Sequence, residues 1–222
     1  WRRERDTAAQ RRTAMLRQIG YGVINRRLLR LSRIVNPPFR GAGLGTSAVF
    51  EIGRTTNLVV DTADKGWRAG LFAAAQPVIG MIHLGALPGT PAGRRSLREI
   101  EALAVKEVVI YREAGLHGLM LENMHDTPYL RGQVGPEIVA AMAVVARAVK
   151  DASRLPCGVQ VLAAANQQAI AVAQAADLEF IRAEGFAFAH VADEGFIQSS
   201  AADLLRYRRA IGAERVQVWA DV

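Results

Sequence analysis

The sequence predicts an α/β protein, an incomplete (β/α)8 barrel of the TIM type with about five parallel strands and four helices. Short apolar runs within residues 77–222 each end in a polar or ionisable residue, and each but the last is followed by a helical stretch. Such repeated units are typical of a parallel sheet covered by helices. The runs are PVIGMIH, GLMLEN, GVQVLA, LEFIRAE and VQVWAD. Since a complete barrel needs eight units and about 250 residues, we expect a barrel that is cut short at Val222.

Capping signals place the first two helices. Ser96 and Glu99 have the spacing of a capping box, and Gly115 supplies a stop after the apolar positions that follow. Pro136 opens the second helix, because proline favours the first helical position, and Pro156 prevents its continuation. We therefore expect a helix between the first and second strands, and another between the second and third.

The third and fourth helices have weaker signals. Asn166 can cap an alanine-rich helix after the third strand. Ser200 with Asp203 has the spacing of another helix start, and Gly212 would close that helix. A helix at each place completes the strand–helix alternation.

Alternation along the strands separates two faces. One face is uniformly apolar and should lie under the helices; it comprises Val78, Ile82, Leu119, Leu121, Val159, Val161, Ile181, Val216 and Val218. The other face should point into the barrel; it comprises Ile79, Met81, His83, Gly118, Met120, Glu122, Gln160, Leu162, Phe180, Arg182, Glu184, Gln217, Trp219 and Asp221. Its ionisable members gather at the strand ends, where they need partners or ligands because an isolated buried charge is costly. Ligand binding is one explanation, and structural ion pairing, such as Arg182 with Glu184 or Glu122, is the other.

The net charge of +7 comes from the N-terminus. Residues 1–40 hold 11 arginines against Glu4 and Asp6, a formal charge of +9, whereas residues 77–222 carry −2. We therefore expect no nucleic-acid binding by the barrel. No apolar run reaches the roughly 18 residues of a membrane span.

Residues 1–76 are expected to form an Arg-rich extension separate from the barrel domain at 77–222. The stretch 15–35 has no acidic residue and the composition of a mitochondrial presequence, so a targeting segment, misassigned sequence and arginine-mediated binding of RNA or acidic lipid all remain open. The expected location is mitochondrial, and otherwise cytoplasmic. Residues 41–76 should be irregular or disordered, apart from a short strand near 57–60. Cys157 opens a buried strand and is expected to be a structural thiol.

Three strings carry a family resemblance: MIHLGALPGTP at 81–91, GLMLENMHDTPY at 118–129, and FIRAEGFAFAHVADEG at 180–195 with LLRYRRAIG at 204–212. Together they resemble the BtpA/SgcQ family, predicted TIM-barrel proteins that include a factor for photosystem I accumulation and a protein assigned to sugar or nucleoside chemistry. The resemblance covers residues 77–222 and not residues 1–76. The matched positions are His83, Leu84, Leu87, Pro88, Gly89, Glu122, Asn123, Asp126, Asn166, Arg182, Asp193, Gly195 and Asp221.

The resemblance and the polar face together imply an enzyme that uses strand-end carboxylates for acid–base chemistry on a small sugar- or nucleoside-type substrate, which could be phosphorylated. The expected catalytic residues are Glu122, Glu184, Asp221 and His83. The expected substrate-binding residues are Asn123, Asp126, Asn166, Arg182 and Asp193. For Asp126, local capping of its loop is an equal alternative.

Other readings stay open. A non-catalytic assembly or stabilising factor for a membrane protein complex is one, and a truncated product without function is another. Without further units, the first and the fifth strand would both be open sheet edges. No cofactor can be assigned, a metal site is not expected because no short ligand motif is present, and formation of a homo-oligomer stays open.

Overall fold

The computed structural model describes residues 47–52, 56–61, 71–72, 74 and 77–221. The predicted parallel strands are confirmed: each of the five apolar runs holds a strand, and these strands are neighbours in one sheet in the order β9-β6-β5-β4-β3. They are β3 (Ile79–His83), β4 (Gly118–Glu122), β5 (Cys157–Gln160), β6 (Phe180–Ala183) and β9 (Gln217–Asp221). The arrangement is consistent with part of a TIM-type barrel.

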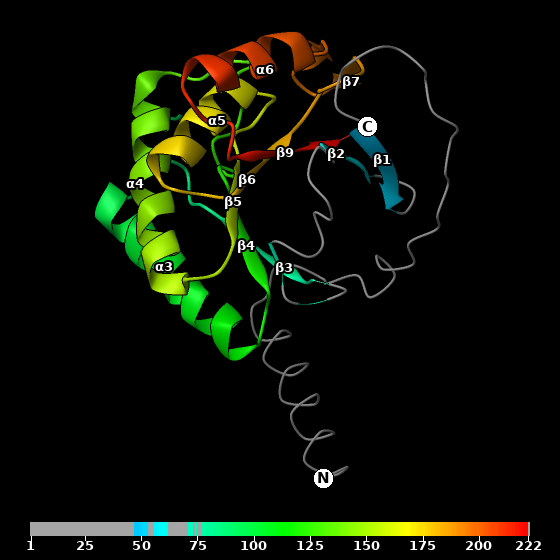
Figure 1. Ribbon diagram of the computed structural model, residues 1–222. Helices are drawn as coiled ribbons and strands as arrows, with labels where there is room; N and C mark the ends of the chain where they lie inside the picture. The colour runs from blue at the N-terminus through cyan, green and yellow to red at the C-terminus, as the bar shows by residue number, and fades with distance from the viewer. Residues whose placement is uncertain (1–46, 53–55, 62–70, 73, 75–76, 222) are drawn as a thin grey trace.

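Four helices in the described part of the chain cover one face of this sheet (Figure 1). They are α3 (Leu97–Glu113), α4 (Pro136–Ser153), α5 (Asn166–Ala175) and α6 (Ala201–Ala210). The strand face predicted to be apolar packs beneath them, and Ile82, Leu119, Leu121, Val159 and Ile181 have no solvent exposure. No helix among the described residues is both long and apolar enough to span a membrane.

The helix starts follow the sequence signals in two cases. The Ser96–Glu99 capping box is present, with the backbone N–H of Ser96 donating to Glu99 Oε2 at 2.8 Å. Gly135 caps α4, and Pro136 is its first residue. Each of these helices therefore begins where its local chemistry predicts.

The expected cap of α5 is wrong. Ala165 is the N-cap residue, and Asn166 is already the first helical residue. Its side-chain Nδ2 donates to the carbonyl of Glu184 at 2.7 Å and to Ser200 Oγ at 2.9 Å. Ser200 precedes α6 but makes no side-chain cap bond, because its hydroxyl donates to the Gly185 carbonyl. Both polar side chains join separate segments instead of capping a helix.

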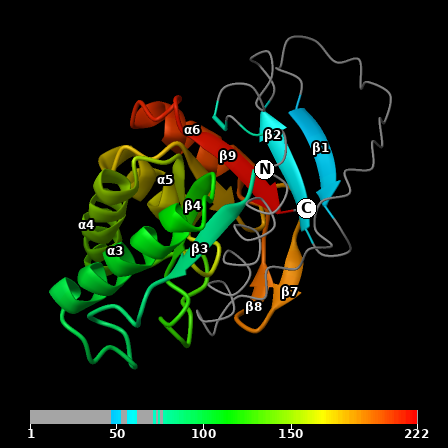
Figure 2. The same cartoon turned by 90° about the horizontal axis from the view of Figure 1, so that it is seen from below.

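An N-terminal hairpin extends the sheet. Strands β1 (Ser47–Ile52) and β2 (Thr56–Asp61) are antiparallel, and β2 pairs antiparallel with β9. Figure 2 shows β2 beside β9. The predicted strand near 57–60 is confirmed, but the expectation of irregular structure before it is wrong at Ser47–Ile52, which form β1. The expectation of an open edge at the fifth strand is also wrong, because β2 occupies that edge. The predictions for residues 1–40, and for most of the rest of the extension, lie outside the described residues.

A second hairpin, β7 (His190–Ala192) and β8 (Gly195–Ile197), lies between β6 and α6. The sequence predicts only a loop there. Each strand has three residues, too few for alternation to reveal. The hairpin forms a separate small sheet beyond the end of β6 (Figure 2).

Aromatic packing fills the inner face of the sheet below the strand ends. Phe180 stacks on Trp219 with ring centroids 3.7 Å apart, and Phe72 and Met120 complete the cluster. A Cβ atom at Gly158 would lie 2.1 Å from the Phe180 ring, so this glycine is what lets the ring lie across β5. The predicted inward face is therefore packed as the layered interior of a barrel would be.

The amino ends of the strands carry structural contacts. Lys150 of α4 pairs with Glu179, whose other oxygen accepts the Cys157 backbone N–H at 2.7 Å. Cys157 is fully buried, and burial raises the pKa of its thiol to about 11. It is thus a core thiol, as expected.

Candidate active site at the ends of the parallel strands

Strand register brings a row of side chains together across the inner face. His83 lies opposite Glu122, Glu122 opposite Gln160, and Arg182 opposite Trp219. Because Val159 pairs with Ile181, Gln160 is next to Arg182 in the same register. Adjacent parallel strands in register point side chains at one level to the same side, so these residues line one level near the strand ends.

His83 and Glu122 form the first contact of the row. The Nε2 atom of His83 is 3.3 Å from Glu122 Oε2, and the Glu122 side chain is only 8% exposed. The hydrogen bond that the Glu122 carboxylate accepts raises the pKa of His83, although partial burial opposes it. The pair is therefore poised to hold a proton between an imidazole and a carboxylate.

Arg182 and Asp221 form a bidentate pair at the other end of the row. Arg182 Nε and the Asp221 carboxylate are 3.0 Å apart, and the second nitrogen–oxygen distance is also 3.0 Å. Burial alone would lower the pKa of Arg182, but Asp221, with the charges of Glu122 and Glu184, raises it above its ordinary value. Asp221 is the partner of Arg182, in place of the Glu184 or Glu122 considered from sequence.

Glu184 lies one position beyond the end of β6 and is held on both oxygens. Its Oε2 accepts the backbone N–H of Ala164 at 3.0 Å, and its Oε1 is 3.2 Å from His190 Nε2. His190 comes from the β7–β8 hairpin. A second histidine–carboxylate pair thus lies on the opposite side of β5 from the first.

Asn123 and Asp126 are joined directly. Asn123 Nδ2 donates to Asp126 Oδ2 at 2.9 Å, and Asn123 Oδ1 accepts the Leu162 backbone N–H at 2.8 Å. Asp126 Oδ1 accepts the Leu87 backbone N–H at 2.8 Å, and burial raises the pKa of Asp126. The two side chains brace the loops after β3, β4 and β5, and their contact with substrate stays a prediction.

The remaining predicted binding residues lie apart from one another. Asn166 is buried and bonded to the Glu184 backbone, beside the second histidine–carboxylate pair. Asp193 is exposed at the turn between β7 and β8. The structure therefore places Asn166 close to Glu184 and Asp193 at the tip of the hairpin.

Sequence reasoning does not single out Tyr129, which packs beside Ala163 and Ala164 after β5. Burial, then the charges of Glu122, Glu194 and Asp126, raise the pKa of the Tyr129 phenol. Its hydroxyl donates to the Met124 carbonyl at 2.6 Å. Strand periodicity gives no signal for Tyr129, because the residue lies in the irregular segment that follows β4.

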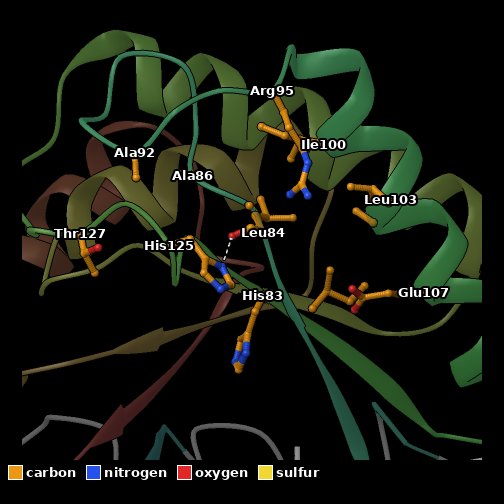
Figure 3. Close-up of a pocket in the computed structure, with 13 residues that line it drawn as sticks. His83, Leu84, Ala86, Ala92, Arg95, Ile100, Leu103, Glu107, His125 and Thr127 are labelled. Atoms are coloured by element: carbon orange, nitrogen blue, oxygen red, sulfur yellow. Dashed lines mark hydrogen bonds between the residues drawn. The ribbon is translucent and has the colours of Figure 1, made fainter. Parts of the chain in front are cut away.

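A cavity of about 410 Å³ lies on the other side of β3, between the β3–α3 loop and α3 (Figure 3). Ile82 and Ile100 supply apolar walls, and Arg95, Glu107 and His125 supply polar ones. His125 Nδ1 is 2.8 Å from the Leu84 carbonyl, so that nitrogen carries the hydrogen and Nε2 is the acceptor in the neutral ring. The cavity is not lined by Glu122, Glu184 or Asp221, and it shares only His83 with the predicted catalytic set.

The carboxylates of the candidate site have other side chains as partners. Within the described part of the chain, no group of three or more His, Cys, Asp or Glu side chains is arranged to hold a metal ion. The carboxylates are instead distributed between two histidines and one arginine. Two histidine–carboxylate contacts therefore lie at separate places near the strand ends.

Several curated proteins resemble the chain. An uncharacterised mitochondrial protein of Caenorhabditis elegans is 42% identical over 158 residues, which are 68% of this chain and 57% of that protein. An uncharacterised protein of Archaeoglobus fulgidus is 36% identical over 65% of this chain and 58% of its own length. The photosystem I biogenesis protein BtpA of Synechocystis is 31% identical over 68% of this chain and 52% of its own length.

The aligned segments of these relatives are only part of each protein. The chain spans between 52% and 58% of the length of the three. No solved structure matches the chain. The family profile that does match covers residues 74–222, which include all five parallel strands and both histidine–carboxylate pairs. The chain therefore belongs to the BtpA family.

Proposed function

We propose that the row at the strand ends is part of an enzyme active site that performs acid–base chemistry on a small sugar- or nucleoside-type substrate, including phosphorylated ones. The observation that carries the proposal is the His83–Glu122 pair, 3.3 Å apart and in register on adjacent strands. A structural ion pair would not need a titratable imidazole at this position, whereas a proton-transfer site does.

The residues divide into proton-transfer and supporting roles. His83, with its raised pKa, donates a proton to a leaving group while Glu122 orients the imidazole. Glu184, held by Ala164 and His190, acts as the second carboxylate from the opposite side of β5. Asp221 fixes Arg182 in the row.

This division of acid and base groups supports the proposed substrate class. Two carboxylate-containing pairs in different environments can protonate a leaving oxygen or nitrogen and activate water on the other side of it. Cleavage of a glycosidic bond in a sugar or nucleoside needs both steps.

The test is a substrate screen combined with a matched pair of variants. This chain and the longer Archaeoglobus fulgidus relative are assayed against nucleosides and sugar phosphates. Glu122→Gln should reduce turnover of any accepted substrate at least 100-fold, because it removes the carboxylate that orients the proton-donating imidazole of His83. Glu113→Gln, at the exposed end of α3, is the control and should leave turnover unchanged. Unchanged turnover in Glu122→Gln, or no substrate for either protein, contradicts the proposal.

A second candidate function is assembly or stabilisation of a membrane protein complex, because the Synechocystis relative is named a photosystem I biogenesis protein. Exposed apolar side chains on and beside the β7–β8 hairpin favour it: Phe188 is 66% exposed, Val191 80% and Phe196 51%. If assembly is the function, Val191→Ser with Phe196→Ser should abolish co-migration with the complex on native gels. Glu122→Gln should leave that co-migration intact, so the two variants separate the two functions.

We also propose a mitochondrial location. The Caenorhabditis elegans relative is described as mitochondrial, and residues 1–40 of this chain carry 11 arginines and only two acidic residues. An arginine-rich, acid-poor N-terminal segment is the composition that mitochondrial import recognises.

A further inference from the structure

The cavity between α3 and the loop after β3 has the size of a small-molecule site. Its volume is about 410 Å³, and such sites usually measure roughly 300–1,000 Å³. Apart from His83, none of the predicted catalytic or substrate-binding residues lines it. The His83 side chain contacts Glu122 and points away from Arg95, as Figure 3 shows. The cavity is therefore separate from the row at the strand ends.

One face of α3 forms the apolar wall of the cavity. Ile100, Leu103, Ala104 and Glu107 all line it, and their spacing places them on the same side of the helix. Ile100 and Ala104 are buried, whereas Leu103 is 45% exposed. The apolar part of a ligand in the cavity would remove the Leu103 side chain from water, which favours binding.

Glu107 places a carboxylate on this otherwise apolar face. Its side chain points from α3 toward β3, and the residue is half-buried (Figure 3). Burial raises the pKa of Glu107, and the charge of His83 offsets this only in part. A hydrogen-bond donor on a ligand would therefore stabilise the carboxylate.

Arg95 supplies a positive charge on the loop side of the cavity. It directly precedes Ser96, the N-cap of α3, and its guanidinium points toward Leu84 in Figure 3. A Cβ atom at Gly85 would lie 3.1 Å from Arg95 Nη1, so the guanidinium lies against the loop after β3. The planar donors of arginine match the geometry of a carboxylate or a phosphate.

We propose that this cavity binds a small amphipathic anion, with its carboxylate or phosphate on Arg95, its apolar body against Leu103 and a hydrogen-bond donor on Glu107. The site goes beyond the proposed active site and does not depend on the proposed function. Arginine accepts either oxyanion, so the experiment compares the two.

The probes are four related molecules whose binding to the chain is measured by calorimetry. 4-Hydroxyphenylacetate has the anion, the apolar ring and the donor, and 4-hydroxybenzylphosphonate replaces its carboxylate with a phosphonate. Phenylacetate lacks the donor, and 4-hydroxyphenylethanol lacks the anion. At least one of the two hydroxylated anions should bind at least about tenfold more tightly than the alcohol, because the alcohol forms no ion pair with Arg95. The tighter of the two identifies the preferred oxyanion.

Arg95→Met tests the anion contact. It should weaken binding of the hydroxylated anion at least about tenfold and leave binding of the alcohol unchanged. Arg98→Met is the matched control, because Arg98 is exposed in the first turn of α3 and does not line the cavity. It should leave the affinity unchanged. Both arginines are exposed, so both variants should keep the Tm of wild type.

Two further variants test the rest of the site. Glu107→Leu should abolish the preference for 4-hydroxyphenylacetate over phenylacetate, since the acceptor for the hydroxyl is removed. Gly85→Ala keeps every charge but places a methyl group against the Arg95 guanidinium, so it should weaken binding of both hydroxylated anions.

Three outcomes would overturn the inference. The first is that neither hydroxylated anion binds to wild-type protein, as when another polypeptide segment fills the cavity. The second is an equal loss of affinity in Arg95→Met and Arg98→Met, which would assign the effect to net charge alone. The third is loss of binding in Glu122→Gln, which would place the probe in the row at the strand ends, because Glu122 does not line the cavity. Binding that Glu122→Gln retains and Arg95→Met loses supports the separate site, whether or not the chain is an enzyme.

Discussion

The contact between His83 and Glu122 is the residue-scale feature with the clearest physical consequence. Glu122 is nearly buried, and the hydrogen bond between the two side chains raises the pKa of His83. A group whose pKa is raised on folding binds its proton more tightly in the folded state. The pair therefore couples the stability of this sheet edge to pH.

The first prediction concerns this coupling. The stabilisation from His83 is fully present below the ordinary histidine pKa of about 6.5 and is lost as pH rises through the raised folded-state pKa. The Tm of wild-type protein should therefore exceed that of His83→Gln by more at pH 5.5 than at pH 8.5. Thermal unfolding of both proteins at the two pH values measures the difference. An equal difference at both values would show that the Glu122 contact does not bind the proton more tightly.

Residue types at the strand ends could be predicted from sequence, but their pairing could not. Alternation alone places His83, Glu122, Arg182 and Asp221 on the inner face. Which carboxylate meets Arg182 depends on the rotamers and on the register of β6 with β9, which local patterns do not contain. The same holds for Asn166, whose amide serves tertiary contacts in place of its expected cap.

At the scale of elements, the hydrogen-bonded pair Asn123 and Asp126 connects loops that are far apart in the sequence. Asp126 reaches the loop after β3 through Leu87, and Asn123 reaches the exit of β5 through Leu162. Both residues are buried, so the bridge is protected from water. The buried side chains of Asn123 and Asp126 thereby position the loops that follow β3, β4 and β5.

The second prediction tests this bridge with Asp126→Asn. The new amide would turn a donor toward Asn123 Nδ2, and Asn123 cannot flip without losing its bond to the Leu162 backbone. The free energy of unfolding should fall by about 1–3 kcal/mol, the cost of leaving a buried polar group unpaired. Urea unfolding measures it. The double variant Asn123→Leu with Asp126→Leu should restore part of the loss, and equal stability of Asp126→Asn and wild type would contradict the prediction.

The third prediction concerns the packing of β5 against β6. A methyl group at Gly158 would overlap the Phe180 ring, which stacks on Trp219. Gly158→Ala should therefore lower the free energy of unfolding by about 1–3 kcal/mol, as overpacking does, and should change Trp219 fluorescence.

A double-mutant cycle supplies the control for that third prediction. In a Phe180→Leu background the clash is smaller, so Gly158→Ala should cost less there than in wild type. Equal costs in the two backgrounds would show that the glycine is not required by the ring.

Long elements were predictable and short ones were not. α3 and α4 have caps, stops and several apolar turns, and both form as predicted. The β7–β8 hairpin has strands of three residues each. It supplies His190, the partner of Glu184, but a single histidine in a short exposed segment is not a signal for a strand. Local patterns therefore miss the element that completes the second histidine–carboxylate pair.

At the scale of the whole molecule, the sheet joins residues from distant parts of the sequence. Leu58 and Val59 of β2 lie opposite Asp221 and Ala220 of β9. The repeated strand–helix units predict the parallel part of the sheet, but no local signal in the extension predicts which edge a hairpin would join. The pairing of β2 with β9 therefore appears only in the structure.

The fourth prediction concerns the whole chain in the cell. Residues 1–40 fused to a fluorescent protein should direct it to mitochondria, because their formal charge of +9 favours import along the membrane potential. Replacing Arg26, Arg27, Arg30 and Arg33 with glutamine should abolish import, seen by microscopy and by fractionation. Cytosolic fluorescence of the unaltered fusion would contradict the proposed location.

The Lys150–Glu179 pair and the core thiol lie at the amino ends of the strands, opposite the rim that carries His83, Glu122 and Asp221. Contacts that keep the strands aligned are thus separated along the sheet from the groups proposed for chemistry. Residues at the carboxyl ends of the strands can therefore be substituted without disturbing the contacts at the amino ends.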